Sequence, residues 1–171
     1  ICNWLTPDQL PHNYFTRIRG FAGQYLAEEL RQRYGGGGPG YVIRQLLPQD
    51  LHLDSWRLPG PPAGERVRID AQGPDDTLIA IYGFHVDPQE VNHVSRLDLW
   101  VGGHRVAMLD FTAFYLPMPP RQNGAEPWQF VPLRYLEGPV LIKSLCTLQI
   151  DMWCTGTDAL AFMPVGETFE R

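Results

Sequence analysis

Apolar and polar residues alternate in two short runs on either side of a Gly102-Gly103 pair. A period of two is typical of half-buried strands, and a Gly-Gly pair between two such runs predicts a β-hairpin with a two-residue turn. The strands would cover residues 94–101 and 104–111. This register places four apolar side chains in the core as two opposed pairs, Leu99 with Val106 and Leu97 with Met108.

The outward face of this hairpin would be polar and aromatic. In the same register Trp100 lies across from Arg105, and Asp98 and Asp110 point outward. Asp151 belongs to a later strand and could converge with them in space. A carboxylate pair suited to glycoside hydrolysis is therefore an open alternative.

The strand pattern continues along the chain from Tyr41 onward. Further strands are expected at Tyr41–Leu47, Val67–Ala71, Thr77–Val86, Phe111–Leu116, Trp128–Leu133, Val140–Leu145, Thr147–Thr155 and Leu160–Val165. Alternation around Val67–Ala71 places Arg66, Arg68 and Asp70 on the outward side. Gly83 marks a candidate β-bulge inside the longest apolar run. Because turn signals are frequent and no helical pattern separates these strands, we expect an all-β fold. It would be a single antiparallel jelly roll or β-barrel of about eight strands over residues 41–171.

The first 40 residues have a different pattern. Thr6-Pro7-Asp8-Gln9 combines a helix N-cap with a proline at the first helical position. Apolar residues then recur at helical spacing, at Phe21, Tyr25, Leu26 and Leu30. The tract Gly35–Gly40, with one proline, ends this helix and provides a flexible hinge. Residues 1–40 are therefore predicted to form a helical arm and a hinge.

Composition and charge exclude several classes of function. The chain has 171 residues and a formal net charge of -5, so it lacks the basic footprint of a nucleic-acid-binding protein. No apolar run reaches the length of a membrane-spanning helix. Of the 14 basic residues only Lys143 is a lysine, a bias that fits a GC-rich genome or a hot environment.

Candidate metal ligands gather in the stretch HVDPQEVNH, which holds His85, Asp87, Glu90 and His93. A cupin, which is a jelly-roll metal enzyme, would place two histidines two residues apart, and no such pair occurs here. We therefore interpret the stretch as a solvated loop and expect neither a metal nor a cofactor.

Nucleophilic catalysis has little support in the sequence. Ser55, Ser95 and Ser144 all lie outside a Gly-x-Ser-x-Gly turn, and a catalytic function is not expected. Cys146 and Cys154 are expected in one strand, too far apart for a disulfide and buried as free thiols. Cys2 lies near a chain end and is freer to react.

Aromatic residues are abundant, at 12% of the chain, and several lie outside clean core positions. Aromatic residues and arginine are enriched at protein interfaces. A candidate interface therefore consists of Trp4, Tyr14, Phe15, Phe21, Tyr25, Trp100 and Arg105. Trp56 in a proline-rich loop is a further exposed candidate. The alternative is that loops and the helix bury these side chains within the monomer.

A helical arm, a glycine hinge and a barrel without a catalytic signature resemble a viral single jelly-roll capsid protein. The chain length, the arginine bias and the stretch PLRYLEGPVLIKSLCTLQIDMW are similar, more narrowly, to the small major capsid protein of tailless, membrane-containing icosahedral phages of Thermus. This resemblance implies a virion protein, assembled in the host cytoplasm, that joins a second, larger major capsid protein in a shell over an internal membrane. It implies no catalytic residue.

Two further expectations concern function. The apolar arm must dock on its own barrel or on a neighbour, so we expect a homodimer to which the arms contribute. The rival interpretation is a jelly-roll carbohydrate-binding module that uses exposed tryptophans, or a divergent cupin-type enzyme.

Overall fold

The computed structural model describes residues 42–62, 65–86, 92–112 and 133–170. Within these ranges the chain forms nine strands and one short 3-10 helix, and no α-helix. The elements are β1 (Val42–Gln45), η2 (Pro48–Leu51), β2 (Arg57–Leu58), β3 (Arg66–Gln72), β4 (Thr77–Val86), β5 (Val94–Val101), β6 (His104–Asp110), β7 (Leu133–Ile142), β8 (Thr147–Cys154) and β9 (Leu160–Glu170). The predicted helical arm and hinge, residues 1–40, lie outside the described residues.

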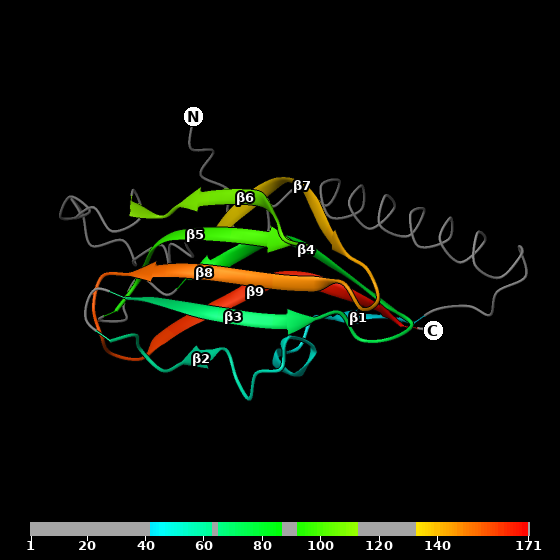
Figure 1. The fold of residues 1–171 in the computed structure, drawn as a ribbon, viewed down its shortest axis with the longest axis horizontal. Coiled ribbons are helices and arrows are strands. Elements are labelled where there is room, and N and C mark those ends of the chain that lie inside the picture. Colours follow the sequence, from blue (N-terminus) through cyan, green and yellow to red (C-terminus); the bar gives the residue numbers. More distant parts are fainter. Residues whose placement is uncertain (1–41, 63–64, 87–91, 113–132, 171) are drawn as a thin grey trace, which may run out of the picture.

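The strands form two antiparallel sheets. The first has the order β1-β9-β4-β7, with β2 also pairing with β9, and the second has the order β3-β8-β5-β6. In Figure 1 the strands of the second sheet cross the view side by side, with β6 uppermost and β3 lowest. From β3 to β9 the chain changes sheet at every connection except the β5–β6 hairpin. The prediction of an all-β fold with antiparallel sheets is therefore confirmed for the described residues.

The core lies between the two sheets. Because side chains alternate along a strand, each strand gives every second residue to this layer. Ile79 and Ile81 of β4 enter it from the first sheet, and Leu99 of β5 and Ile150 of β8 enter it from the second. Phe84 and Phe162 stack with ring centroids 5.4 Å apart.

The β5–β6 hairpin has the predicted turn but not the predicted register. Gly102 and Gly103 have φ angles of 57° and 80°, the left-handed region that such a turn requires. The pairs Val101 with His104 and Trp100 with Arg105 form as expected. Beyond them the register shifts by one residue, and four pairs follow, among them Leu99 with Ala107 and Leu97 with Leu109.

This bulge overturns half of the predicted hairpin core. Leu97 and Leu99 are fully buried, as predicted. Val106 and Met108 are 47% and 58% exposed, and Leu109 enters the core in their place. The physical reason is that one extra residue in a strand moves every later side chain to the other face.

The other strands follow their predicted positions with differences at the ends. Thr77–Val86 has the predicted bounds, and the register shift between Ile81 and Gly83 confirms the expected bulge. A Cβ atom on Gly83 would lie 2.4 Å from the backbone oxygen of Arg134, so only glycine fits there. The sequence predicts two separate strands in this region, Trp128–Leu133 and Val140–Leu145. The structure instead has one continuous strand, β7, from Leu133 to Ile142, so the expected break after Leu133 is wrong.

The central strands of the first sheet, β4 and β9, are buried on both faces. Four of its buried apolar side chains lie outside the main core cluster: Leu78, Ala80, Tyr82 and Phe169. The Tyr82 hydroxyl donates a hydrogen bond of 2.7 Å to Glu167, which is also buried. The outer side of this sheet is therefore an apolar layer. The outer side of the second sheet is different in character and carries the candidate site.

Candidate functional site

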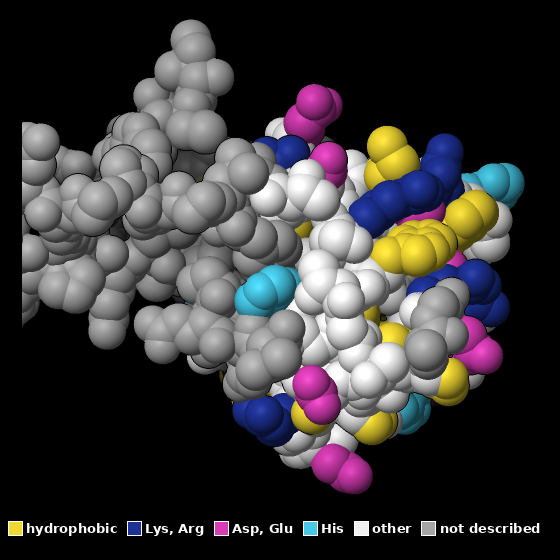
Figure 2. Space-filling model, turned by 90° about the vertical axis from the view of Figure 1, so that its left-hand side faces the viewer, with side chains coloured by type: hydrophobic (Ala, Val, Ile, Leu, Met, Phe, Trp, Pro, Cys, Tyr) yellow, Lys and Arg dark blue, Asp and Glu magenta, His cyan; other side chains and the backbone are white. Residues whose placement is uncertain are grey.

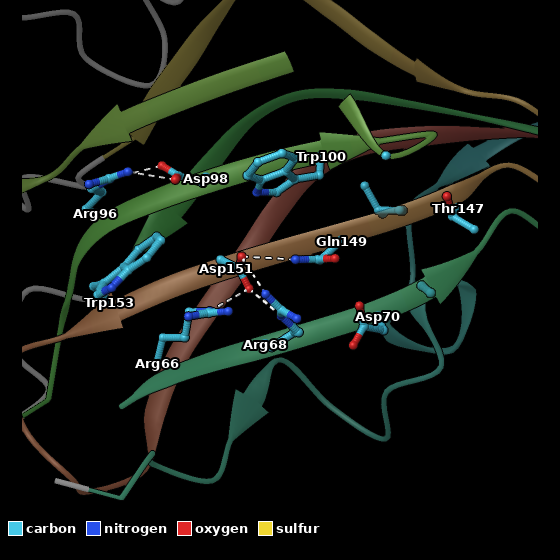
Figure 3. Close-up of a pocket in the computed structure, with 13 residues that line it drawn as sticks. Arg66, Arg68, Asp70, Arg96, Asp98, Trp100, Thr147, Gln149, Asp151 and Trp153 are labelled. Carbon is cyan, nitrogen blue, oxygen red and sulfur yellow. Dashed lines mark hydrogen bonds and ion pairs between the residues drawn. The ribbon is translucent and has the colours of Figure 1, made fainter. Parts of the chain in front are cut away.

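The outer side of the second sheet holds a polar hollow of about 740 Å³. Nine of the side chains that line it come from three neighbouring strands: Arg66, Arg68 and Asp70 of β3, Gln149, Asp151 and Trp153 of β8, and Arg96, Asp98 and Trp100 of β5. Figure 3 shows these side chains on one side of the sheet. We call this surface, together with Arg105 of β6, the arginine face.

The strand register determines which of these side chains meet. Arg66 and Arg96 are both cross-strand partners of Trp153, and Arg68 and Asp98 are both partners of Asp151. The face therefore consists of rows that run across the strands. One row places an indole between two guanidinium groups, and the next places two carboxylates side by side.

Asp151 lies at the centre of the arginine face and is 3% exposed. Arg68 donates to its two oxygens at 2.7 and 3.1 Å, and Gln149 donates at 3.0 Å. Arg66 forms an ion pair with it at 3.1 Å. Burial alone would raise the pKa of Asp151, but the hydrogen bonds from Arg68, Gln149 and Arg66 outweigh burial and hold this pKa below its ordinary value. Figure 3 shows Arg66 and Arg68 reaching from β3 toward this carboxylate.

Asp98, which is 2% exposed, is held from the other side. Arg96 donates to its two oxygens at 3.0 and 2.7 Å, and Arg105 lies 3.6 Å from it. Hydrogen bonds to the carboxylates raise the pKa of Arg68 and of Arg96. Asp98 and Asp151 are direct cross-strand partners, a repulsive arrangement for two like charges, and the surrounding arginines compensate for it.

Both tryptophans of the face contact arginine. The guanidinium carbons of Arg96 and Arg66 lie 4.6 and 5.8 Å from the ring centroid of Trp153, within the range of a cation–π interaction. The corresponding distance from Arg105 to Trp100 is 5.9 Å. In Figure 2, dark-blue basic side chains lie on both sides of yellow hydrophobic ones, with magenta acidic atoms near them. The buried indole N–H of Trp100 has no acceptor among the described residues.

The structure describes two of the sequence-predicted interface residues and does not test the interface itself. Trp100 and Arg105 come together as predicted. The other predicted members lie outside the described residues: Trp4, Tyr14, Phe15, Phe21 and Tyr25. Trp56 is partly buried and packs against the core, which favours for this residue the alternative that it is buried within the monomer.

Of the three carboxylates considered for glycoside hydrolysis, the register pairs only Asp98 with Asp151. Asp98 points outward as expected, but it is buried beneath arginines and not exposed. An acid catalyst in such a pair needs a raised pKa, whereas the pKa of Asp151 is lowered. The arrangement suits a structural ion-pair network.

Sequence reasoning did not include Arg66, Arg68, Arg96 and Trp153 among the candidate site residues. A signal was present, because Arg66 and Arg68 occupy the outward positions of a strand whose alternation was recognised. Nothing in the sequence indicated that β8 would bring Trp153 and Asp151 between these arginines and those of β5.

Metal and thiol chemistry receive no positive support. Within the described ranges no three His, Cys, Asp or Glu side chains form a group that could hold a metal ion, and Asp87 and Glu90 lie outside those ranges. Cys146 and Cys154 are free, as predicted, but half-buried, and Cys146 precedes β8. Burial raises the pKa of the Cys154 thiol, which makes it a poor nucleophile.

A second ion-pair network joins β1, η2 and β9. Arg44 donates to the two oxygens of Asp50 at 2.6 and 2.7 Å and also forms an ion pair with Glu170. The backbone N–H of Leu47 donates to Asp50 at 2.8 Å. Burial would raise the pKa of Asp50, but the hydrogen bonds from Arg44 and Leu47 outweigh burial and lower it. This network fastens the first strand of the fold to the last.

Comparisons with known proteins add little. No protein-family model and no curated protein matches the chain. The crystal structure of dimeric latent PorU from Porphyromonas gingivalis matches with a TM-score of 0.33 and 13% sequence identity. The match covers 80% of this chain and 14% of the PorU chain, and a similarity this weak carries no argument. Among the described residues no helix is long and apolar enough to cross a bilayer.

Proposed function

We propose that the chain is a single jelly-roll capsid subunit, a structural protein that acts by association and not by catalysis. The observation that carries this proposal is the strand order, β1-β9-β4-β7 in one sheet and β3-β8-β5-β6 in the other. Jelly rolls pair two sheets in this way, with the chain crossing repeatedly between them, and the strand order therefore supports this fold. Viral capsid domains, lectin domains and cupins share this arrangement. The sequence resemblance to a small phage capsid protein favours the first of these classes.

Exposed apolar side chains on edge strands support association. Val106 and Met108 are exposed on β6, which ends the second sheet among the described strands. Val42 and Ile43 are exposed on β1, which ends the order of the first sheet. Edge strands with exposed apolar side chains are surfaces at which another chain can pair or pack.

The proposed partners come from the sequence. The subunit would form a homodimer to which residues 1–34 contribute, and it would combine with a larger capsid protein into a shell over an internal membrane. The virion would be its final location, after assembly in the host cytoplasm.

Light scattering tests this proposal. The full chain, a variant without residues 1–34, and Met108→Glu are compared over a range of concentrations. We expect the full chain to be a dimer and the shortened chain to be a monomer. Leu145→Glu is the matched control, because Leu145 is equally exposed but lies between two strands.

A full chain that stays monomeric at every concentration would refute the dimer. A shortened chain that still dimerises would show that the arm is not needed for the contact. If Met108→Glu then abolishes dimerisation and Leu145→Glu does not, the contact lies on β6.

The second candidate function is carbohydrate binding. It is favoured by the half-exposed Trp153 on the outer side of a sheet, where an indole can stack on a sugar ring. Binding of the full chain to a neutral glycan on an array, lost in Trp153→Ala, would support this function over the capsid proposal.

A further inference from the structure

We infer that the arginine face is a binding surface for carboxylate groups, presented as a row by an acidic segment of a protein partner. This inference does not depend on the capsid proposal or on the arm. It follows from the hydrogen-bonding groups that remain available on the face once its internal contacts are formed.

The carboxylates of the face are already occupied. Asp151 receives hydrogen bonds from Arg68 and Gln149 and an ion pair from Arg66, and it is buried. Asp98 is bound by Arg96 through two hydrogen bonds and is also buried. Neither carboxylate is available to accept from a ligand.

The donors of the face are not exhausted. Four guanidinium groups carry far more N–H donors than two carboxylates have lone pairs, and the side chains of Arg66, Arg68, Arg96 and Arg105 are each between 41% and 49% exposed. The buried N–H of Trp100 also lacks an acceptor, a deficiency that an oxygen atom entering the hollow would relieve. Asp70 is the one exposed carboxylate among the lining residues.

A surface that offers donors but few acceptors selects its ligand by chemistry. A neutral sugar has hydroxyl groups that donate as well as accept, so it needs acceptors that this face has already engaged. A carboxylate only accepts, and guanidinium groups bind it with charge-assisted hydrogen bonds. The face therefore favours an oxyanion over a neutral glycan.

The spacing of the arginines favours several linked anions over one small ion. Arg66 and Arg68 lie on β3, whereas Arg96 lies on β5, with β8 between these strands. Neighbouring strands are about 4.8 Å apart, so the backbones of the two strands that carry these donors are roughly 10 Å apart. One carboxylate cannot reach both groups. On a segment in the polyproline II conformation, acidic side chains three residues apart point the same way and lie about 9 Å apart, so they span this distance.

Fluorescence anisotropy of the full chain with a fluorescein-labelled hexaglutamate peptide tests the inference. Labelled hexaglutamine provides the uncharged comparison. We expect hexaglutamate to bind in a salt-sensitive manner and hexaglutamine not to bind. Arg105→Gln should weaken the binding about tenfold, because it removes a charged donor. Among the described residues the only ion pair of Arg105 is the one with Asp98, at 3.6 Å, so we expect Arg105→Gln to fold.

Two further variants make the result specific. Trp100→Phe keeps an aromatic ring but removes the unpaired N–H, and it should also weaken binding. Arg57→Gln removes an exposed arginine from β2, away from the face, and should bind like the unmodified chain. Circular dichroism confirms that each variant is folded.

Three results would overturn the inference. Equal affinity of Arg105→Gln and Arg57→Gln for hexaglutamate would show that the peptide does not bind at the arginine face. Binding of phosphatidylglycerol vesicles without binding of hexaglutamate would assign the face to a membrane surface. Binding of neither probe would leave the arginines a purely structural role. Because light scattering measures dimerisation separately, failure here and failure of the capsid proposal are distinguishable.

Discussion

Alanine substitutions on β6 test the register of the β5–β6 hairpin. In the structure Leu109 lies opposite Leu97 and enters the core, whereas its neighbour Met108 lies on the outer side beside Asp98. Without the bulge the two would exchange faces. Leu109→Ala and Met108→Ala are therefore a matched pair, since each removes a side chain of similar size from adjacent positions of one strand.

The magnitudes follow from burial. Leu109 is 9% exposed, so its replacement by alanine removes about three buried carbon atoms at roughly 0.8 kcal/mol each. A loss of about 2–3 kcal/mol is expected, near the lower end for buried leucines, because β6 ends the second sheet among the described strands and its surroundings can relax. Met108 is 58% exposed, and its truncation should change the free energy of unfolding by less than about 0.5 kcal/mol.

Urea unfolding followed by tryptophan fluorescence measures both variants, and an unchanged m-value would show that the unfolded states are comparable. For a chain of this length, Leu109→Ala should lower the melting temperature by about 5–10 °C. A larger loss in Met108→Ala than in Leu109→Ala would refute the bulge. That result would instead support the unbulged hairpin predicted from the sequence, in which Met108 is buried and Leu109 points outward.

Three further predictions concern other parts of the fold. Gly166→Ala should destabilise strongly, because the new Cβ would lie 2.4 Å from the Ala80 oxygen, whereas Gly138→Ala has open space and should be nearly neutral in thermal melting. Asp151 has a lowered pKa in the folded state, so its stabilisation is complete above its unfolded pKa of about 3.9 and is lost as pH falls through the folded value. The melting temperatures of the chain and of Asp151→Asn should therefore converge in acid. Cys154 should react with iodoacetamide more slowly in the folded chain than in urea.

The sequence was sufficient for the strands but not for their detailed pairing. Alternation and the Gly-Gly turn predicted β5, β6 and the first two hairpin pairs correctly. The bulge on β6 was missed, because His104–Asp110 contains apolar residues at both odd and even positions, including Val106, Met108 and Leu109. Only packing against Leu97 and the rest of the second sheet determines which of these side chains is buried.

The candidate site was less predictable than the strands, for a topological reason. Its residues come from four strands, β3, β5, β6 and β8. The two that are farthest apart in the sequence, Arg66 and Trp153, are separated by 87 positions. The pattern predicted that Arg66 and Arg68 point outward. It did not predict that β8 lies between β3 and β5, and that neighbour relation creates the ion pairs with Asp151.

The arginine excess of the chain has a local physical reason on this face, apart from genome or temperature. Arg68 and Arg96 each hold a carboxylate through two N–H groups, a geometry that the single ammonium of lysine does not reproduce. Arg66 and Arg96 also lie over one indole ring, that of Trp153, where a planar guanidinium stacks better than an ammonium. These contacts compensate two adjacent buried carboxylates and still leave N–H donors exposed. Lysine at the same positions would keep the charge, but it would not supply this combination of internal compensation and outward recognition.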